Sequence, residues 1–169
     1  MNEISLAKAT IRKQILESRK ASNPESQELT ANLLAVVEQY QPKRVGTYLS
    51  YPSEPSTTEL IETLINRGTT VLVPETAGEN ELVWHEVVTG NEATLTSGDL
   101  VFIPALAVDE TGNRLGRGKG YFDRELSELS GVVIYAVVFE REVLDSIPVE
   151  GHDQRVHGVV TEVQIRKIN

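Results

Sequence analysis

The stretch Val132-Val-Ile-Tyr-Ala-Val-Val-Phe139 is the longest continuous apolar run in the chain. A strand buried on both faces has this composition, because helices cover both sides of a parallel sheet. Three shorter segments, 44–49, 70–73 and 100–103, also have the length and composition of strands. We therefore expect all four segments to be strands, with a further strand over Leu82–Val87.

Helical patterns alternate with these strands. Ile4, Ala7, Ile11 and Ile15 recur at three- and four-residue spacing, which predicts an N-terminal helix with one apolar stripe. Three more helices are expected: from the start signal Asn23-Pro24-Glu25 to about Tyr40, from the capping box Ser56-x-x-Glu59 to Gly68, and over Tyr121–Leu129, with Gly131 as its stop.

The alternation of strands and helices predicts an α/β fold of right-handed βαβ units. We expect one domain over residues 1–169, with a mainly parallel sheet and helices on both faces, in a Rossmann-like three-layer arrangement. In such sheets, ligands bind beyond the carboxyl ends of the strands. Two expected loops, Ser50–Pro55 and Ala105–Gly120, follow strands at such ends, so the functional site is expected there.

The composition narrows the function further. A chain of 169 residues with a formal charge of −9 is a poor candidate for nonspecific binding to nucleic acid or membranes. The absence of cysteine excludes disulfides, thiolate metal sites and a cysteine nucleophile, and it fits a cytoplasmic protein. No apolar run has the length of a signal peptide or a membrane helix.

The charge is distributed unevenly. Residues 8–20 contain five cations and one acid, and residues 114–124 contain four cations and one acid. The remaining 145 residues carry 7 cations and 23 acids. Two basic segments in an acidic body indicate a local anion-binding site, even though the whole chain is acidic.

The second basic segment lies in the glycine-rich stretch Gly112-Asn-Arg-Leu-Gly-Arg-Gly-Lys-Gly-Tyr-Phe-Asp123. Alternating glycines permit positive φ angles and let exposed amides form an anion-binding nest, and the free amides at a helix start favour anions too. The loop therefore indicates phosphate binding, although a flexible surface turn with incidental charges is the alternative. The spacing matches neither a Walker A loop nor a dinucleotide fingerprint.

Asp123, in the first turn of the expected helix, has two interpretations. A carboxylate beside bound phosphate needs a cation, for which magnesium is the usual solution. Alternatively, the residue only complements the helix dipole.

Several segments together resemble the 5-formyltetrahydrofolate cyclo-ligase family, also called methenyltetrahydrofolate synthetases. They are Lys8-x-x-x-Arg12, Tyr48-Leu-Ser-Tyr-Pro-Ser-Glu54-Pro-x-Thr57, Asp99-Leu-Val-Phe-Ile-Pro104-x-Leu106-Ala107-x-Asp109, Gly112-x-Arg114-Leu115-Gly116-x-Gly118-x-Gly120-Tyr121-Phe122-Asp123-Arg124 and Pro148-Val-Glu-Gly-His-Asp153-Gln-Arg-Val-x-Gly158-Val-Val-Thr161-Glu162. Their order and spacing hold over nearly the whole chain. The family often has Asp where this chain has His157.

The resemblance implies an ATP- and Mg²⁺-dependent ligase of one-carbon metabolism that converts 5-formyltetrahydrofolate to 5,10-methenyltetrahydrofolate and releases ADP and phosphate. It implies ATP binding by Lys8, Arg12, Arg114, Leu115, Gly116, Arg117, Gly118, Lys119, Gly120, Tyr121 and Phe122. It implies folate binding by Leu49, Glu54, Arg117, Gly118, Lys119, Gly120 and Tyr121, and magnesium binding by Asp123 and Asp153.

Residue chemistry agrees with these assignments. Arg117 and Lys119 are expected to be catalytic, because cations stabilise charge on a transferring phosphoryl group. Glu54 offers only acceptors and suits the NH-rich pterin, although it could equally be a solvated loop residue. Tyr48, Tyr51 and Trp84 could stack on an aromatic ligand or pack in the core.

A phosphosugar isomerase or phosphosugar-sensing domain on a similar α/β scaffold is the alternative, because a phosphate loop alone does not define the chemistry. Lys8, Arg12 and Asp153 favour the ATP–magnesium enzyme. We expect ATP and a reduced folate as the partners of a monomer. A noncatalytic interaction protein would require no such constellation.

Overall fold

The computed structural model describes residues 1–79 and 81–169. The helices found there are α1 (Glu3–Arg19), α2 (Gln27–Tyr40), α3 (Thr58–Asn66) and α4 (Tyr121–Glu128), with a 3₁₀ turn over Glu140–Glu142. The large sheet contains β1 (Val45–Thr47), β2 (Val71–Ala77), β3 (Glu81–Glu86), β4 (Glu92–Ala93), β5 (Leu100–Pro104), β8 (Val133–Val137), β10 (Gly158–Val160) and β11 (Ile165–Lys167). A small sheet contains β6 (Ala107–Asp109), β7 (Arg114–Leu115) and β9 (Val143–Leu144).

The large sheet is mixed, with a parallel centre. Its strands lie in the order β11-β10-β8-β5-β1-β2-β3-β4. The neighbours from β10 to β2 pair in parallel, whereas β11, β3 and β4 add antiparallel edges. The expected mainly parallel α/β sheet is confirmed. The antiparallel edge strands β4 and β11 were not predicted, because each has only two or three residues.

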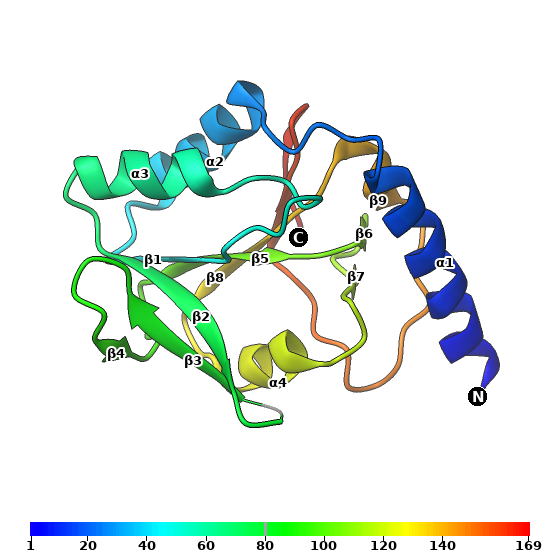
Figure 1. The fold of residues 1–169 in the computed structure, drawn as a ribbon. Coiled ribbons are helices and arrows are strands. Elements are labelled where there is room, and N and C mark those ends of the chain that lie inside the picture. The colour runs from blue at the N-terminus through cyan, green and yellow to red at the C-terminus, as the bar shows by residue number, and fades with distance from the viewer. Residues whose placement is uncertain (80) are drawn as a thin grey trace.

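Helices cover both faces of the sheet, as expected (Figure 1). On one face, α2 and α3 bury Leu33 and Leu60 against the central strands. On the opposite face, α4 buries Leu126 among residues such as Val101 and Ile134. The first helix, α1, stands beside the small sheet, where it buries Ile15. No helix among the described residues is long and apolar enough to cross a membrane.

Two expected helix starts are wrong. Helix α2 begins after Ser26, whose Oγ accepts a hydrogen bond from the Leu29 amide at 3.1 Å, whereas Asn23 accepts only from Glu25 in the preceding turn. Helix α3 begins after Thr57 without a side-chain cap, because the Thr57 hydroxyl donates to the Tyr48 carbonyl at 2.6 Å instead. That bond ties the start of α3 to the end of β1.

The end of β2 also differs from the prediction. The strand continues through Pro74 to Ala77. Proline is tolerated here because β1 pairs with β2 only at Val71 and Leu72, so that no neighbour on that side requires an amide donor from Pro74. The added residues form a β2–β3 hairpin that reaches beyond the sheet and supplies one wall of the pocket described below.

The segment Ala105–Gly120, expected to be a loop, contains the hairpin β6–β7. Asp109 anchors it, accepting hydrogen bonds from Thr111, Asn113 and the Ile147 amide. Burial acts to raise the pKa of Asp109, but the hydrogen bonds from Asn113 and Thr111 outweigh it and lower the pKa below the usual value. This ionised anchor fixes the hairpin that leads into the glycine loop.

The chain order reverses between β1 and β5. From β1 the chain runs outward to β2, whereas from β5 it runs to β8 on the opposite side. The loops that follow β1 and β5 therefore leave adjacent strands at the same edge of the sheet. Such a reversal opens a crevice that ligands can enter.

Candidate active site

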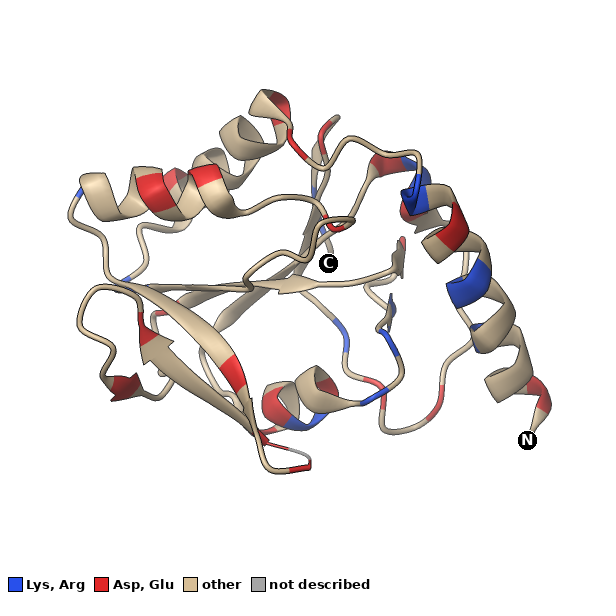
Figure 2. Cartoon of the chain, viewed as in Figure 1, with Lys and Arg blue, Asp and Glu red and all other residues tan. Residues whose placement is uncertain are grey.

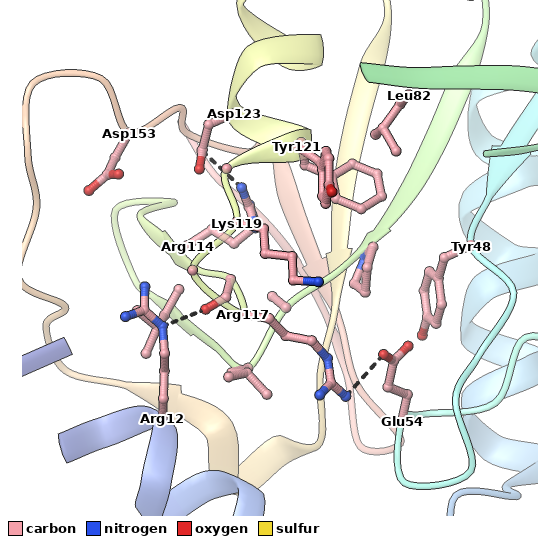
Figure 3. Close-up of a pocket in the computed structure, with 18 of the residues that line it drawn as sticks. Arg12, Tyr48, Glu54, Leu82, Arg114, Arg117, Lys119, Tyr121, Asp123 and Asp153 are labelled. Atoms are coloured by element: carbon pink, nitrogen blue, oxygen red, sulfur yellow. Dashed lines mark hydrogen bonds and ion pairs between the residues drawn. The ribbon is translucent and has the colours of Figure 1, made fainter. Parts of the chain in front are cut away.

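One pocket of about 830 Å³ lies at this edge, between α1, α4 and the β2–β3 hairpin. It is lined by every residue to which the sequence assigned a role: Lys8, Arg12, Leu49, Glu54, Arg114, Leu115, Gly116, Arg117, Gly118, Lys119, Gly120, Tyr121, Phe122, Asp123 and Asp153. Figure 3 shows two opposite sides, with Arg12, Asp123 and Asp153 on one and Tyr48 with Glu54 on the other. We call these the cationic end (Lys8, Arg12, Arg114, loop 116–120 without the Arg117 side chain, Asp123, Asp153) and the Glu54 end (Tyr48, Tyr51, Glu54 and the Arg117 side chain).

Helix α1 brings Lys8 to the cationic end. The Lys8 ammonium contacts the Asp153 carboxylate at 2.5 Å and Glu150 at 3.1 Å, and the Lys8 side chain is 7% exposed. Burial acts to lower the pKa of Lys8, but the hydrogen bonds to Asp153 and Glu150 raise it overall. Burial acts to raise the pKa of Asp153, but its bond with Lys8 lowers it overall. Both groups are therefore charged near neutrality.

One turn later, Arg12 fastens α1 to the glycine loop. Its Nε donates to the Gly116 carbonyl at 2.9 Å. Gly118 has a φ of +102°, and a Cβ there would lie 3.4 Å from Arg12 Cζ. Gly120, with a φ of +71°, precedes α4 and provides no side-chain cap, so the first amides of that helix are left for other acceptors.

Arg114 and Asp123, assigned to different ligands by the resemblance, are bound to each other. Their side chains form an ion pair at 2.8 Å, and Asp123 Oδ1 also accepts from the Gln154 amide at 3.2 Å. The Arg114 side chain is 3% exposed, so the strand β7 presents it inward rather than to solvent. The pair joins the hairpin, the start of α4 and the segment that follows Asp153.

At the Glu54 end, a nearly buried carboxylate lies under an exposed guanidinium. Glu54 Oε1 is 3.2 Å from Arg117 Nη2, with side-chain exposures of 4% and 42%. Burial raises the pKa of Glu54, and the nearby Arg117 charge offsets only part of that rise. The Arg117 guanidinium also lies 5.2 Å from the centre of the Tyr51 ring.

Tyr48 supports the Glu54 end from beneath. Its hydroxyl donates to the Pro55 carbonyl at 2.7 Å, and burial raises its pKa well above the usual value. The neutral hydroxyl therefore holds the Ser50–Pro55 loop that carries Glu54. Tyr51 in the same loop is exposed, so of the three aromatic residues considered from the sequence, Tyr51 is free to meet a ligand.

Two other residues lie outside the pocket. Trp84 is buried, donates to Glu125 at 2.8 Å and packs in the core, as the alternative interpretation held. His157 accepts from the Ile134 amide through Nδ1 at 2.9 Å and does not line the pocket. His157, which differs from the family pattern, thus accepts a hydrogen bond from the backbone of β8.

Lys119 points into the middle of the pocket (Figure 3). Arg12, Lys8, Arg114 and Arg117 all have partners, whereas Lys119 has no ion pair within residues 1–79 and 81–169. A ligand can therefore reach the Lys119 ammonium without first breaking an ion pair.

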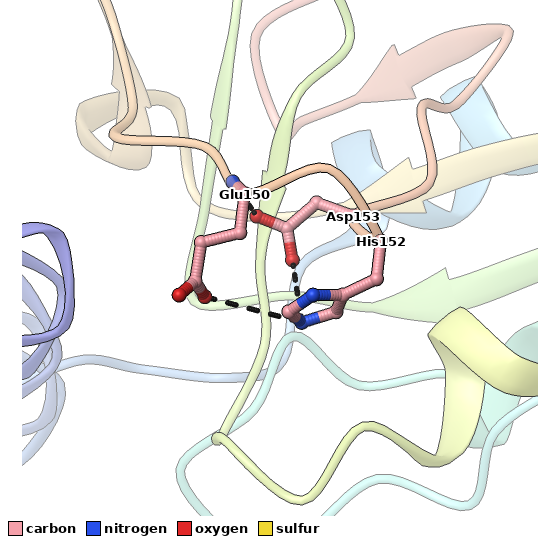
Figure 4. Close-up of side chains that lie close together, drawn as sticks. All are labelled: Glu150, His152 and Asp153. Atoms are coloured by element: carbon pink, nitrogen blue, oxygen red, sulfur yellow. Dashed lines mark hydrogen bonds and ion pairs between the residues drawn. The ribbon is translucent and has the colours of Figure 1, made fainter.

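The sequence did not single out Glu150, and it left His152 without a definite role. Figure 4 shows both beside Asp153, and their ligand atoms lie within 4.8 Å of one another. Asp123 is not a member of this group. The available signal was their position in Glu150-Gly-His-Asp153, directly around an assigned metal ligand.

The distribution of charge agrees with two basic segments in an acidic body. Figure 2 shows Lys and Arg along α1 and along the loop between β7 and α4. Both segments line the cationic end. Fold and pocket together define a three-layer α/β protein with a cation-lined site at the strand reversal.

The comparisons with known proteins are more specific. The sequence profile of the 5-formyltetrahydrofolate cyclo-ligase family matches residues 4–97 and 88–162. A 5-formyltetrahydrofolate cyclo-ligase from Mycolicibacterium smegmatis is 32% identical over 142 residues, which cover 70% of this chain and 73% of that protein. One from Mus musculus is 31% identical over 163 residues, covering 79% and 80%. The chain therefore belongs to the 5-formyltetrahydrofolate cyclo-ligase family, as the resemblance implied.

Solved structures confirm the fold. A 5,10-methenyltetrahydrofolate synthetase from Aquifex aeolicus superposes with a TM-score of 0.79 at 24% identity, covering 96% of this chain and 93% of that one. The corresponding protein from Mycoplasma pneumoniae gives a TM-score of 0.80 at 20% identity, covering 92% and 98%.

Proposed function

We propose that the pocket binds ATP at its cationic end and 5-formyltetrahydrofolate at its Glu54 end. As a member of its family, the chain is an ATP-dependent ligase that converts 5-formyltetrahydrofolate to 5,10-methenyltetrahydrofolate. The observation that carries the proposed arrangement is the juxtaposition, in one pocket, of a cation-lined glycine loop and a nearly buried carboxylate beside an exposed tyrosine.

The phosphates are assigned to the cationic end. Arg12, the amides of loop 116–120 and the uncapped start of α4 surround a space that suits several negative oxygens. Lys8, with its raised pKa, adds a cation from α1. In this arrangement α1 and the glycine loop hold the nucleotide between them.

The reaction proceeds without a protein nucleophile. The formyl oxygen attacks the γ-phosphorus of ATP, and ADP leaves. The neighbouring folate N–H nitrogen then attacks the activated formyl carbon and loses its proton to solvent, the carbon–oxygen bond breaks so that phosphate leaves, and the five-membered ring is closed. The protein aligns the two substrates and stabilises charge on the transferring group, the task proposed for Lys119 and Arg117.

Magnesium is proposed at the cationic end, at Asp123 and Asp153, with Glu150 as an additional oxygen donor. Mg²⁺ prefers carboxylate oxygens, and the Lys8 ammonium between Asp153 and Glu150 already shows that this corner accommodates positive charge. When bound, the metal would neutralise negative charge on the phosphates. The imidazole of His152 is a poorer ligand for this ion.

We also propose that the chain works as a cytoplasmic, single-domain monomer. Every residue with an assigned role comes from the same chain and lines the same pocket, so the site needs no partner subunit to complete it. No nucleic acid or membrane partner is proposed, because the chain carries a formal charge of −9 and its two basic segments both contribute to the lining of the pocket.

The test is a direct assay. Purified protein is mixed with 5-formyltetrahydrofolate, ATP and Mg²⁺, and the ultraviolet absorbance of the methenyl product is followed. Product should require all three additions, and the variant Arg67→Ala, which removes an exposed ion pair with Glu38 away from the pocket, should retain activity. A folded protein that forms no ATP-dependent product would refute the proposal.

A further inference from the structure

The guanidinium of Arg117 occupies the position that a flat, hydrogen-bonding ring would take at the Glu54 end. Its Nη2 donates to Glu54 Oε1 at 3.2 Å, and its Cζ lies 5.2 Å from the Tyr51 ring centre. Glu54 is nearly buried, whereas Arg117 and Tyr51 are open to the pocket. The loop after β1 and the loop after β7 are thereby bridged across the pocket by one ion pair (Figure 3).

The chemistry of Arg117 matches that of the proposed substrate. A guanidinium is a planar carbon that carries N–H donors in a fork suited to a carboxylate. The 2-amino-4-oxopyrimidine ring of a pterin presents the same unit, because an amino group and a ring N–H flank one carbon. Both groups are flat and can lie over a tyrosine face. A site that offers both a carboxylate and a tyrosine ring, as Glu54 and Tyr51 do for Arg117, therefore suits either group.

The two groups cannot both be fully bound. A pterin that donates two parallel hydrogen bonds needs both oxygens of Glu54, and Arg117 holds Oε1. Arg117 is flanked by Gly116 and Gly118, so few side chains oppose a change in its direction. Its loop is the one that faces Arg12 at the cationic end.

We infer that Arg117 is an internal stand-in for the pterin: its guanidinium occupies the pterin position until folate displaces it. The displaced guanidinium is then released toward the ATP phosphates. This inference rests on the proposed function. Release of Arg117 makes the stabilisation of the transferring phosphoryl group depend on the presence of the folate, which is the phosphoryl acceptor. Without folate, Arg117 stays paired with Glu54, and attack of water on the γ-phosphorus, with departure of ADP, lacks one of its cations.

The first test measures binding of 5-formyltetrahydrofolate without ATP, by calorimetry, to the wild type and to Arg117→Met. An ordinary substrate-binding arginine would weaken binding when removed. Removal of a stand-in should have the opposite effect. The Kd for 5-formyltetrahydrofolate should fall by about threefold, because the partly exposed ion pair between Arg117 and Glu54 no longer competes with the substrate. Lys119→Met is the matched control, since it removes a cation from the same loop without contacting Glu54, and it should not tighten binding.

The second test measures ATP hydrolysis in the absence of folate. Glu54→Gln weakens the ion pair and frees Arg117, so hydrolysis to ADP should rise severalfold although folate binding becomes weaker. A Glu54 that only binds folate would leave this background rate unchanged. Thermal denaturation checks that both variants are folded.

The outcomes separate the two hypotheses. If the wild type forms no methenyl product, the proposed function fails, and this inference fails with it. If the wild type forms product but Arg117→Met binds folate equally or more weakly, or Glu54→Gln leaves the background hydrolysis unchanged, the stand-in role alone is refuted.

Discussion

At the cationic end, Lys8 contacts two carboxylates and Arg114 a third, whereas at the Glu54 end one carboxylate meets one guanidinium. The cationic end draws its charges from α1, β7, α4 and the segment 150–153, and these charges compensate one another. The Glu54 end relies instead on burial and on a short loop held by a tyrosine hydroxyl. A polyanion that binds at the cationic end must therefore replace carboxylates as the partners of the cations. At the Glu54 end, recognition of a neutral ring depends on the position of a single carboxylate, that of Glu54.

The strongest test of this contrast is Lys8→Met. It leaves Asp153 and Glu150 without their ammonium, and hydrogen bonds to charged groups contribute about 1.5–3 kcal/mol each, so kcat/KM for ATP should fall about 10- to 100-fold. The KM for folate should stay the same, since the Glu54 end is untouched. Steady-state kinetics with each substrate varied in turn give both values.

Lys20→Met is the matched control for that experiment. Lys20 directly follows α1, is 73% exposed, pairs with Glu17 and does not line the pocket, so both KM values should match the wild type. An unchanged ATP dependence in Lys8→Met would remove α1 from the nucleotide site.

A smaller effect is expected from Tyr48→Phe at the Glu54 end. The change leaves the Pro55 carbonyl without its donor, which should lower the free energy of unfolding by about 1–2 kcal/mol. Because the same loop carries Glu54, the KM for folate should rise severalfold while the KM for ATP stays constant. Denaturant unfolding and kinetics measure the two effects.

Tyr40→Phe is the control for Tyr48→Phe. It also removes a tyrosine hydroxyl, but not one that positions the Ser50–Pro55 loop. Tyr40 pairs with the Tyr135 hydroxyl at 3.1 Å, away from the pocket, so its removal should affect stability but neither KM. Equal folate KM values in Tyr48→Phe and the wild type would contradict the proposed positioning.

The smallest expected effect concerns the pH dependence of the free energy of unfolding, to which the carboxylates at the two ends contribute with opposite sign. The raised pKa of Glu54 means that the folded state holds its proton longer, so Glu54 lowers stability as pH rises from 4.5 through that raised value. The lowered pKa of Asp153 contributes stability that is present above 3.8 and is lost as pH falls through the lowered value.

Urea unfolding at several pH values tests these signs in Glu54→Gln and Asp153→Asn. Relative to the wild type, Glu54→Gln should gain stability as pH rises above 4.5, whereas Asp153→Asn should lose it as pH rises from below 3.8. Parallel pH profiles for both variants would show that the two carboxylates do not differ in this way.

The sequence was sufficient for the large elements, and the residues that the resemblance assigned all line the pocket, but Glu150 and the β2–β3 hairpin in its wall were not predicted. Long apolar runs such as Val132–Phe139 can only be buried as strands here, and loops after adjacent parallel strands must meet. The pairings were not predictable: Lys8 and Asp153 are 145 residues apart, and no local pattern indicates that they touch. Likewise, both Asn23 and Ser26 are good helix caps, and only the packing of α2 selects Ser26.

The contact between Lys8 and Asp153 also has a consequence for biosynthesis. On the ribosome, Lys8 of α1 is made 145 residues before the Asp153 carboxylate that it contacts. Contacts of such long range form late in folding. In a nascent chain, Lys8 therefore lacks its carboxylate partners until residues 150–153 have emerged, and a polypeptide that stops before them cannot assemble the cationic end of its pocket.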